Sequence, residues 1–357
     1  MFDAATKAYA DADINPREDV DGFVSAAEDL NTGTSIFDEY TPDQLGAVLK
    51  PLLTISGDGI HALATAYMQI QTGALDVVVV EAHSKASEIL DPVKIMNFAS
   101  DPMLNRLPNV HPYHIAGLEM NRFLHETGLT QETCSQVVVQ NRRNALANPN
   151  AAFGAQLTVK DVSESQPLFA PLKTLDCSNT CDGAVVLVLA TKEKAKKLDS
   201  KPIWLDGIAW YNETPSLETR NWERAVYAEL AAKRAYKMAR VKSPRKDIDL
   251  FEVDDTFSYK ELQHLRALDV DEPRELKRSI QDGDFDVDGE LPVNASGGSL
   301  GVGNSLECSG LEHVYEVVQQ LRGEAGKLQA KDVESAVAQS WRGLPTTSGA
   351  VAVLRAE

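Results

Sequence analysis

Strand-like and helix-like segments alternate along most of this 357-residue chain. Residues 76–81 and 182–190 are short runs rich in β-branched and other apolar residues, which is typical of buried strands. Residues 60–72 instead repeat their apolar positions every three to four residues, which is typical of a helix with one buried face. Such alternation is characteristic of the α/β class, so we predict an α/β protein.

The order of the predicted elements occurs twice. In the first part we expect strands at residues 20–25, at the end of the stretch 47–55, and at residues 76–81 and 182–190, and helices at residues 4–12, 60–72 and 193–198. In the second part we expect strands at residues 202–205, 248–253, 335–339 and 349–354 and helices at residues 223–240, from residue 259, and at residues 311–321. This repetition suggests an internal duplication, with an N-terminal half at residues 1–200 and a C-terminal half at residues 201–357.

Two irregularities interrupt this scheme. From about residue 87 to residue 170 the pattern loosens, and since such a length is unusual for a connection, we expect an inserted subdomain with helices of its own. In addition, no strand precedes Ala4 in the first half. We therefore expect an N-terminally shortened sequence that lacks a central strand of one sheet.

Charge and cysteine content narrow the range of functions. The 53 acidic and 35 basic residues leave a net charge of −18, which repels phosphate backbones and anionic lipids, so we expect neither nucleic acid nor a membrane as a partner. The apolar runs are too short to span a bilayer. Four cysteines without a C-x-x-C pair favour a reduced, cytoplasmic setting, without a disulfide framework or a metal site.

Four segments carry motifs that belong together. They are Ser56-Gly57-Asp58-Gly59 with the following helix and strand, residues 174–190, the stretch Glu252-Val253-Asp254-Asp255-Thr256-Phe257, and the loop from Val293-Asn294-Ala295-Ser296-Gly297-Gly298 to Gly310. In order and spacing they resemble the thiolase superfamily, specifically its sterol-carrier-protein-type and archaeal acetoacetyl-CoA thiolase branch. The third segment resembles the family's H-D-x-F motif, and the fourth resembles its N-x-S-G-G and G-H-P loop.

The resemblance implies a five-layer αβαβα sandwich of two duplicated halves with an inserted loop subdomain. It implies Claisen chemistry beside a coenzyme A thioester, which would be the substrate, and no covalently bound cofactor. It also implies association into a homodimer, or into a heterodimer with another thiolase-like subunit, and a zinc-ribbon/OB protein as a further partner.

The positions that carry the family's chemistry hold other residues in this sequence. Ser56 stands where the family has its nucleophilic cysteine, Asn304 where it has the histidine of G-H-P, and Asp254 where it has the histidine of H-D-x-F. The C-terminal motif reads Gln339-Ser340-Trp341-Arg342-Gly343. A serine without an adjacent base is a weak nucleophile, and an amide cannot accept a proton at neutral pH, so we expect ordinary thiolase turnover to be lost.

Other residues could replace the lost groups, and each also has a structural interpretation. Cys308, four residues after Asn304, could be a relocated thiol or a small buried residue. Asp254 or Asp255 could be a general base with a raised pKa, or part of a turn or helix cap. Tyr259 could be an acid in a retro-aldol reaction, or a core or interface tyrosine.

Three further residues are candidates for binding the cofactor portion of a thioester. Gly297 and Gly298 belong to the loop that resembles the family's N-x-S-G-G motif. Trp341 replaces a small or polar residue of the family with a large ring, so we expect it to narrow the end of the pantetheine tunnel.

Three functions remain open at this level. We favour a thiolase-fold protein of acyl-CoA metabolism that is a degenerate or non-Claisen subunit, working with an active thiolase-like or zinc-ribbon/OB partner. The alternatives are a retro-aldolase of a β-hydroxyacyl-CoA that uses Asp254 or Asp255 with Tyr259, and an acetyl-CoA C-acyltransferase that uses Ser56 or Cys308. Aldol cleavage needs no acyl-enzyme, which would explain a serine at position 56.

Overall fold

Two four-stranded sheets form the frame of the computed structural model, which describes residues 1–32, 39–106, 109–198 and 200–356. The first sheet has the order β2-β1-β3-β6 and the second the order β7-β10-β9-β8. Their strands are β1 (Gly22–Ala26), β2 (Leu52–Ile55), β3 (Val77–Lys85), β6 (Asp182–Ala190), β7 (Trp204–Asn212), β8 (Leu250–Glu252), β9 (Ser335–Arg342) and β10 (Ser348–Arg355). In each half the last strand, β6 or β10, runs antiparallel to its neighbours, whereas the preceding strands are parallel.

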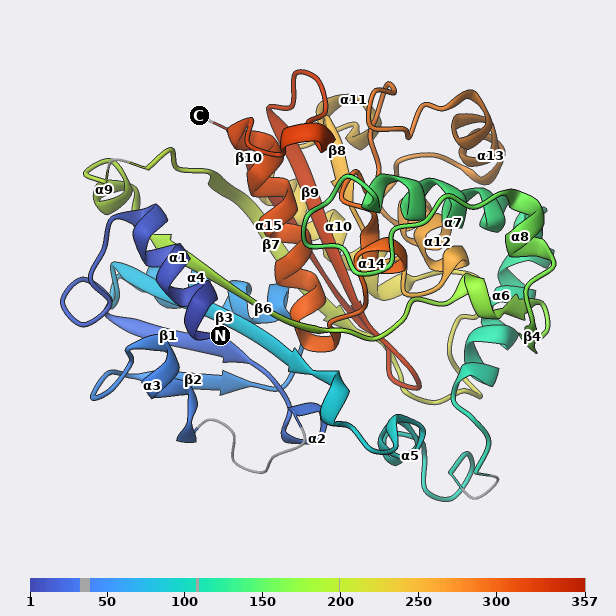
Figure 1. Cartoon of the computed structure of the whole chain (residues 1–357), viewed down its shortest axis with the longest axis horizontal. Coiled ribbons are helices and arrows are strands. Elements are labelled where there is room, and N and C mark those ends of the chain that lie inside the picture. The colour runs from blue at the N-terminus through green and yellow to red at the C-terminus, as the bar shows by residue number, and fades with distance from the viewer. Residues whose placement is uncertain (33–38, 107–108, 199, 357) are drawn as a thin grey trace.

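Helices lie on both faces of each sheet, so the molecule has five layers (Figure 1). Helices α4 (Gly59–Gln71) and α15 (Ser309–Arg322) fill the space between the sheets, where they contribute to one shared apolar core. Helix α1 (Phe2–Ala12) covers the outer face of the first sheet, and α10 (Val226–Ala239) covers that of the second. The predicted α/β class and the five-layer αβαβα sandwich are confirmed.

The inserted subdomain has helices of its own, as its length predicts. They are α5 (Pro92–Phe98), α6 (Tyr113–Thr127), α7 (Gln131–Ala145) and α8 (Val159–Ser163). Of these, α6 and α7 pack against α12 (Ser258–Ala267) of the second half, and α7 also packs against α13 (Pro273–Asp282). The remaining short elements are α2 (Asp29–Thr32), α3 (Thr41–Leu45), β4 (Pro167–Phe169), β5 (Leu172–Lys173), α9 (Lys192–Ala195), α11 (Pro244–Asp247), α14 (Gly298–Gly301) and the single 3₁₀ turns η2 (Ala86–Glu88), η3 (Thr174–Asp176), η4 (Leu306–Cys308) and η5 (Gly326–Leu328).

Most predicted elements form. The stretch 47–55 ends in a strand, β2, as expected, and Leu49 before it has a left-handed φ of 64°, which interrupts the extended chain. The strand expected at residues 202–205 continues through β7 to Asn212, because it pairs with β10 over that length.

We expected the strand that is missing from the first half to be a central strand of its sheet, and this expected position is wrong. In the second half the strand that opens the repeat is β7, and β7 lies at the edge of its sheet, paired with β10 alone. The corresponding place in the first half is therefore the outer edge of β6.

The closest approach in the central layer lies where α4 and α15 begin. A Cβ atom on Gly59 would lie 2.5 Å from Leu311 Cγ and 2.8 Å from the Leu311 backbone nitrogen. Only glycine allows the two helices this separation, because the backbone of α15 cannot move away without disturbing both sheets.

We expect Gly59→Ala to lower the free energy of unfolding by about 3 kcal/mol, at the upper end of the usual cost of overpacking a core. Chemical denaturation followed by circular dichroism measures this value. The matched control is Gln71→Ala at the exposed end of the same helix, which should change stability by less than about 0.5 kcal/mol. Equal stability of the two variants would contradict the tight helix contact.

Candidate active site

Asp254 lies directly after β8, in the loop that leads into α12, and is 2% exposed. Its carboxyl oxygens accept hydrogen bonds from the backbone nitrogen and the Oγ1 of Thr256, both at 3.1 Å. Burial, with added repulsion from Asp255 and Asp58, raises the pKa of Asp254 to about 8. At neutral pH this carboxyl group therefore holds a proton and can give it up near physiological pH.

Asn304 extends this arrangement into a cluster of four residues, which we call the Asp254 cluster: Asp254, Thr256, Asn304 and Ser178. The Asn304 Nδ2 lies 3.3 Å from Thr256 Oγ1 and 3.4 Å from Ser178 Oγ, and donates to both. Thr256 and Asn304 are half-buried, whereas Asp254 lies deeper. The cluster thus combines an amide donor that solvent can reach with a titratable carboxyl group behind it.

Asp58 connects the site to the central helices. Its carboxylate accepts from the Ile60 backbone nitrogen at 2.8 Å in α4 and from the Gly310 nitrogen at 2.9 Å in α15. Burial raises the pKa of Asp58 to about 6, although these backbone donors oppose the rise. Asp58 therefore caps two helices at once and also contributes to the raised pKa of Asp254.

Ser56 lies at the exposed end of the turn before α4, and its surroundings do not activate it. Its Oγ donates to Glu28 Oε1 at 2.5 Å, and the same carboxylate oxygen forms an ion pair with Arg342. His61, one turn into α4, has no hydrogen-bond partner on its buried Nδ1 among the described residues. Burial, with the positive charge of Arg342, lowers the pKa of His61 to about 4. Among the described residues, the only base hydrogen-bonded to Ser56 is therefore a carboxylate already paired with arginine.

Cys308 and Asp255 lie in buried structural contacts instead of a reactive site. The Cys308 Sγ donates to the Ala82 carbonyl at 3.2 Å, and burial raises the pKa of its thiol well above the ordinary value. Asp255 accepts from Asn141 Nδ2 at 2.8 Å and from the Ser299 nitrogen at 2.5 Å, at the start of α14. The structure thus favours the packing interpretation of Cys308 and the cap interpretation of Asp255.

Gly297, Gly298 and Trp341 are likewise accounted for by packing. A Cβ atom on Gly297 would lie 2.6 Å from the Ala145 Cβ, and one on Gly298 would lie 2.4 Å from the Asp255 carboxylate. Both glycines also have positive φ, at 105° and 55°. Trp341 is 7% exposed and lies with its ring centroid 4.2 Å from the Lys260 Nζ.

Tyr259 belongs to a buried ionic group that the sequence analysis did not identify. Its hydroxyl donates to Glu119 Oε2 at 2.7 Å, and the same oxygen lies 2.8 Å from the Lys260 ammonium. Since Tyr259 is fully buried and its pKa lies well above the ordinary value, it is not positioned as an acid beside Asp254. Charged residues at the buried positions of predicted helices were the available signal for Glu119 and Lys260.

Hydrogen bonds connect this ionic group to the loop of Asp254. The Lys260 Nζ lies 3.4 Å from the Tyr227 hydroxyl, which lies 2.9 Å from His264 Nε2. The opposite nitrogen, His264 Nδ1, lies 2.8 Å from the Asp254 carbonyl oxygen. Burial lowers the pKa of His264 well below its ordinary value, so the neutral imidazole donates from Nδ1 and holds the Asp254 backbone in place.

Comparison with known proteins agrees with this geometry. Residues 212–356 match the thiolase C-terminal domain-like family. The acetyl-CoA acetyltransferase of Methanothermobacter thermautotrophicus is 34% identical over 293 residues, which are 82% of this chain and 75% of that protein. The chain belongs to the thiolase superfamily. The resemblance stated from its motifs is thereby confirmed.

Two further proteins are similar to nearly the whole chain. The 17-hydroxy-3-oxo-4-pregnene-20-carboxyl-CoA lyase of Mycobacterium tuberculosis is 28% identical over 374 residues, covering 97% of this chain and 91% of that protein. The solved Ltp2-ChsH2(DUF35) aldolase has a TM-score of 0.81 at 25% identity and covers 98% of this chain and 90% of its own. The printed names of these relatives thus include carbon–carbon lyases as well as acetyltransferases.

Two other features were tested over the described residues. No group of three or more His, Cys, Asp or Glu side chains in them could hold a metal ion. No helix among them is both long enough and apolar enough to cross a bilayer.

The raised pKa of Asp254 predicts a specific dependence of stability on pH. Between the unfolded pKa near 3.8 and the folded pKa of about 8, the folded state keeps a proton that the unfolded state has lost. Raising the pH through this window therefore destabilises the fold by up to about 1.4 kcal/mol per pH unit through this group. Asp254→Asn removes that contribution.

We expect urea unfolding between pH 5 and pH 8 to show a shallower loss of stability for Asp254→Asn than for the unmodified chain. The control is Asp182→Asn, because Asp182 is exposed and its pKa is lowered by Ser87, so it does not titrate in this range. Parallel pH profiles for Asp254→Asn and the unmodified chain would contradict the assignment.

Proposed function

We propose that this thiolase-superfamily protein cleaves the carbon–carbon bond of a β-hydroxyacyl-CoA thioester by a retro-aldol reaction. The observation that carries the proposal is the Asp254 cluster, in which a buried carboxyl group that titrates near neutrality lies behind an amide donor. The relatives named as a CoA lyase and as an aldolase support the same reaction class. We infer the substrate class from them and from the acetyl-CoA acetyltransferase relative.

In the proposed reaction Asp254 acts in its ionised form, which its pKa of about 8 makes the minor form at neutral pH, and accepts the proton of the substrate β-hydroxyl. The electron pair of that O–H bond forms a carbonyl group, the adjacent carbon–carbon bond breaks, and its electrons form the enolate of the shortened thioester. Asp254 then returns a proton to the enolate carbon, so the products are an aldehyde or ketone and a shorter acyl-CoA. Proton transfer is efficient because a catalytic group works best with a pKa near the operating pH.

Asn304 is the proposed donor to the thioester oxygen as negative charge develops there. Its Nδ2 already makes long hydrogen bonds to Thr256 and Ser178, at 3.3 Å and 3.4 Å, which an oxyanion could replace. No covalent intermediate and no free coenzyme A enter the reaction, so neither Ser56 nor Cys308 is required. The His264 contact to the Asp254 carbonyl makes His264 a positioning residue.

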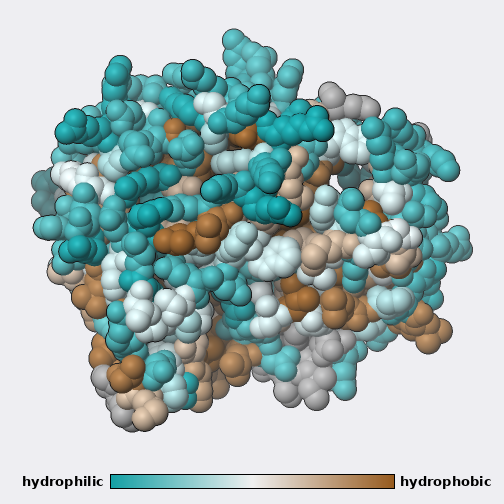
Figure 2. Space-filling view, turned by 180° about the vertical axis from the view of Figure 1, so that it is seen from behind, coloured by the Kyte–Doolittle hydropathy of each residue, from teal (hydrophilic) through white to brown (hydrophobic). Residues whose placement is uncertain are grey.

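We also propose that the protein acts in a complex in the cytoplasm, as a dimer with a zinc-ribbon/OB partner. The exposed large apolar side chains include Leu49 just before β2, Leu53 in β2, and Leu90, Phe98 and Met103 in and around α5. From behind, apolar side chains gather along the lower margin of the molecule (Figure 2). Apolar surface of this kind is typical of protein–protein interfaces. The aldolase neighbour is also named as a complex of two different proteins.

Asp254→Asn should lower kcat for cleavage of a 3-hydroxyacyl-CoA by about 100-fold or more, since it removes the group that transfers protons. Chromatographic detection of the shortened acyl-CoA, in assays without added coenzyme A, measures this rate. Ser56→Ala is the control and should stay within about twofold of the unmodified chain. Assays are run with and without the zinc-ribbon/OB partner.

Two outcomes of this assay would overturn the proposal. Cleavage of acetoacetyl-CoA that requires free coenzyme A and disappears in Ser56→Ala would identify an acyltransferase. A folded chain that cleaves neither thioester, alone or with its partner, would identify the degenerate subunit that the sequence analysis favours.

Incubation with excess acetyl-CoA should leave the protein without an acetyl adduct, because Ser56 lacks an activating base and Cys308 is a buried thiol. Intact-protein mass spectrometry after acid quenching tests this. An adduct that maps to either residue and is absent from Ser56→Ala or Cys308→Ala would show that an acyl-enzyme forms.

A further inference from the structure

A cavity of about 550 Å³ lies between helix α6 and the segment that precedes α10. We call it the Arg220 cavity. Its lining residues are Leu118 and Arg122 of α6 and Arg220, Asn221, Trp222 and Glu223 of that segment. None of these residues belongs to the Asp254 cluster, so the cavity is a candidate for a separate binding site.

Arg220 is a buried cation with free hydrogen-bond donors. It is 6% exposed, and its Nη2 donates to the Pro345 carbonyl oxygen, whereas Nε and Nη1 have no hydrogen-bond partner among the described residues. A guanidinium group presents two pairs of parallel N–H bonds, each of which fits a carboxylate. Because Pro345 takes a single N–H bond, one such pair remains available on Arg220.

The charge of Arg220 is not neutralised by the described residues around it. The Glu213 carboxyl is half-buried and interacts with Arg220 only at longer range, without an ion pair. The buried Glu119 carboxylate already pairs with Lys260 at 2.8 Å, and Lys260 lies close enough to Arg220 to interact with it electrostatically. Two buried cations thus share one buried carboxylate, which is a costly arrangement unless a further anion binds.

The other charged residues that line the cavity are already paired. Arg122 forms an ion pair with Glu126 at 2.5 Å, and Glu223 forms one with Arg266 at 2.8 Å. These pairs leave Arg220 as the lining residue whose charge has no counterion in the described chain. The cavity therefore has an excess of one positive charge, although the whole chain is acidic.

The rest of the lining indicates an apolar body for the ligand. Leu118 is 52% exposed, and the Trp222 ring is held in place by a 3.2 Å hydrogen bond from its Nε1 to the Leu217 carbonyl oxygen. The volume lies within the usual range of small-molecule sites, about 300–1,000 Å³. One unpaired cation matches the charge of a carboxylate, whereas a phosphate dianion would need further donors.

We propose that the Arg220 cavity is a binding site for a small organic carboxylate with an apolar body. The carboxylate accepts the free N–H bonds of Arg220, while the apolar body lies against Trp222 and Leu118. Binding neutralises the buried charge, which is the main source of affinity. The proposal does not rest on the proposed retro-aldol reaction, because none of these residues takes part in it.

The test is isothermal titration calorimetry of the full chain with benzoate, which should show saturable binding to one site. Benzamide has the same shape without the charge and should bind at least about tenfold more weakly. Inorganic phosphate should also bind at least about tenfold more weakly than benzoate. Equal affinities for benzoate and benzamide would show that the cavity does not recognise an anion.

Arg220→Met removes the charge and should weaken benzoate binding by at least about tenfold. Trp222→Ala keeps the charge and removes the apolar contact, so it should weaken binding by about fivefold to tenfold, and it tests the cavity even if Arg220→Met does not fold. The matched control is Arg278→Met in α13, an exposed arginine paired with Asp282, which should stay within about twofold. Circular dichroism verifies that each variant folds.

The carboxylate could belong to a free acid or to the end of an acyl chain, and competition distinguishes the two. Displacement of benzoate by glutaryl-CoA but not by butyryl-CoA assigns the site to a carboxylated acyl group, whereas displacement by neither assigns it to a free acid. Displacement by both would place the phosphates of coenzyme A in the cavity and overturn the proposal. Unchanged benzoate affinity in folded Arg220→Met would overturn it as well.

Discussion

The structure depends on one buried carboxylate, that of Asp58, which caps the N-termini of two helices at the same point. Asp58 accepts hydrogen bonds from the first turns of both α4 and α15, and a Cβ atom on Gly310 would lie only 1.9 Å from its Oδ1. Helix N-termini attract negative charge, so the two helices can converge here, and their convergence fixes the distance between the sheets. The same charge contributes to the raised pKa of Asp254. A packing constraint of the fold thus also tunes the candidate site.

The architecture could be predicted from the local pattern of apolar and polar residues, because most helices and strands show this pattern within their own sequence. The apolar run 182–190 forms β6 over that same range, and the duplicated order of elements appears as two sheets of related topology. The extent of a strand was harder to predict where pairing with a neighbouring strand decides it. The sequence of β7 contains Asp206 and Gly207, which weaken a strand signal, yet pairing with β10 holds it extended to Asn212. The periodicity of apolar residues also could not show that β6 lies at the edge of its sheet.

The site was predictable only at positions that match family motifs. Ser56, Asn304 and Asp254 follow from spacing, but the difference between Asp254 and its neighbour Asp255 does not. Asp255 is hydrogen-bonded to Asn141, 114 positions away, and to Ser299 at the start of α14, 44 positions away. The pair of Glu119 and Lys260 was missed for the same reason, since α6 and α12 meet only in the folded chain. Both carboxyl groups are buried, so their hydrogen-bond partners, and neither burial nor residue type, separate Asp254 from Asp255.

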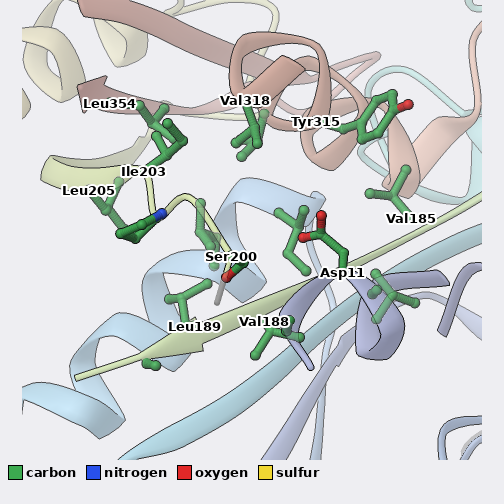
Figure 3. Close-up of a pocket in the computed structure, with 18 of the residues that line it drawn as sticks. Asp11, Val185, Val188, Leu189, Ser200, Ile203, Leu205, Tyr315, Val318 and Leu354 are labelled. Carbon is green, nitrogen blue, oxygen red and sulfur yellow. The ribbon is translucent and has the colours of Figure 1, made fainter. Parts of the chain in front are cut away.

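The cavity along β6 and the candidate site share a structural element, helix α15. Its first turn binds Asp58, while Val314 and Val318 further along it line a cavity of about 1090 Å³ beside β6 (Figure 3). Arg322, at its last turn, forms an ion pair with Asp11 of α1 at 2.8 Å, which joins two helices that line this cavity. Because close-packed helices shift as units, the position of α15 in the central layer constrains the cavity and the site together.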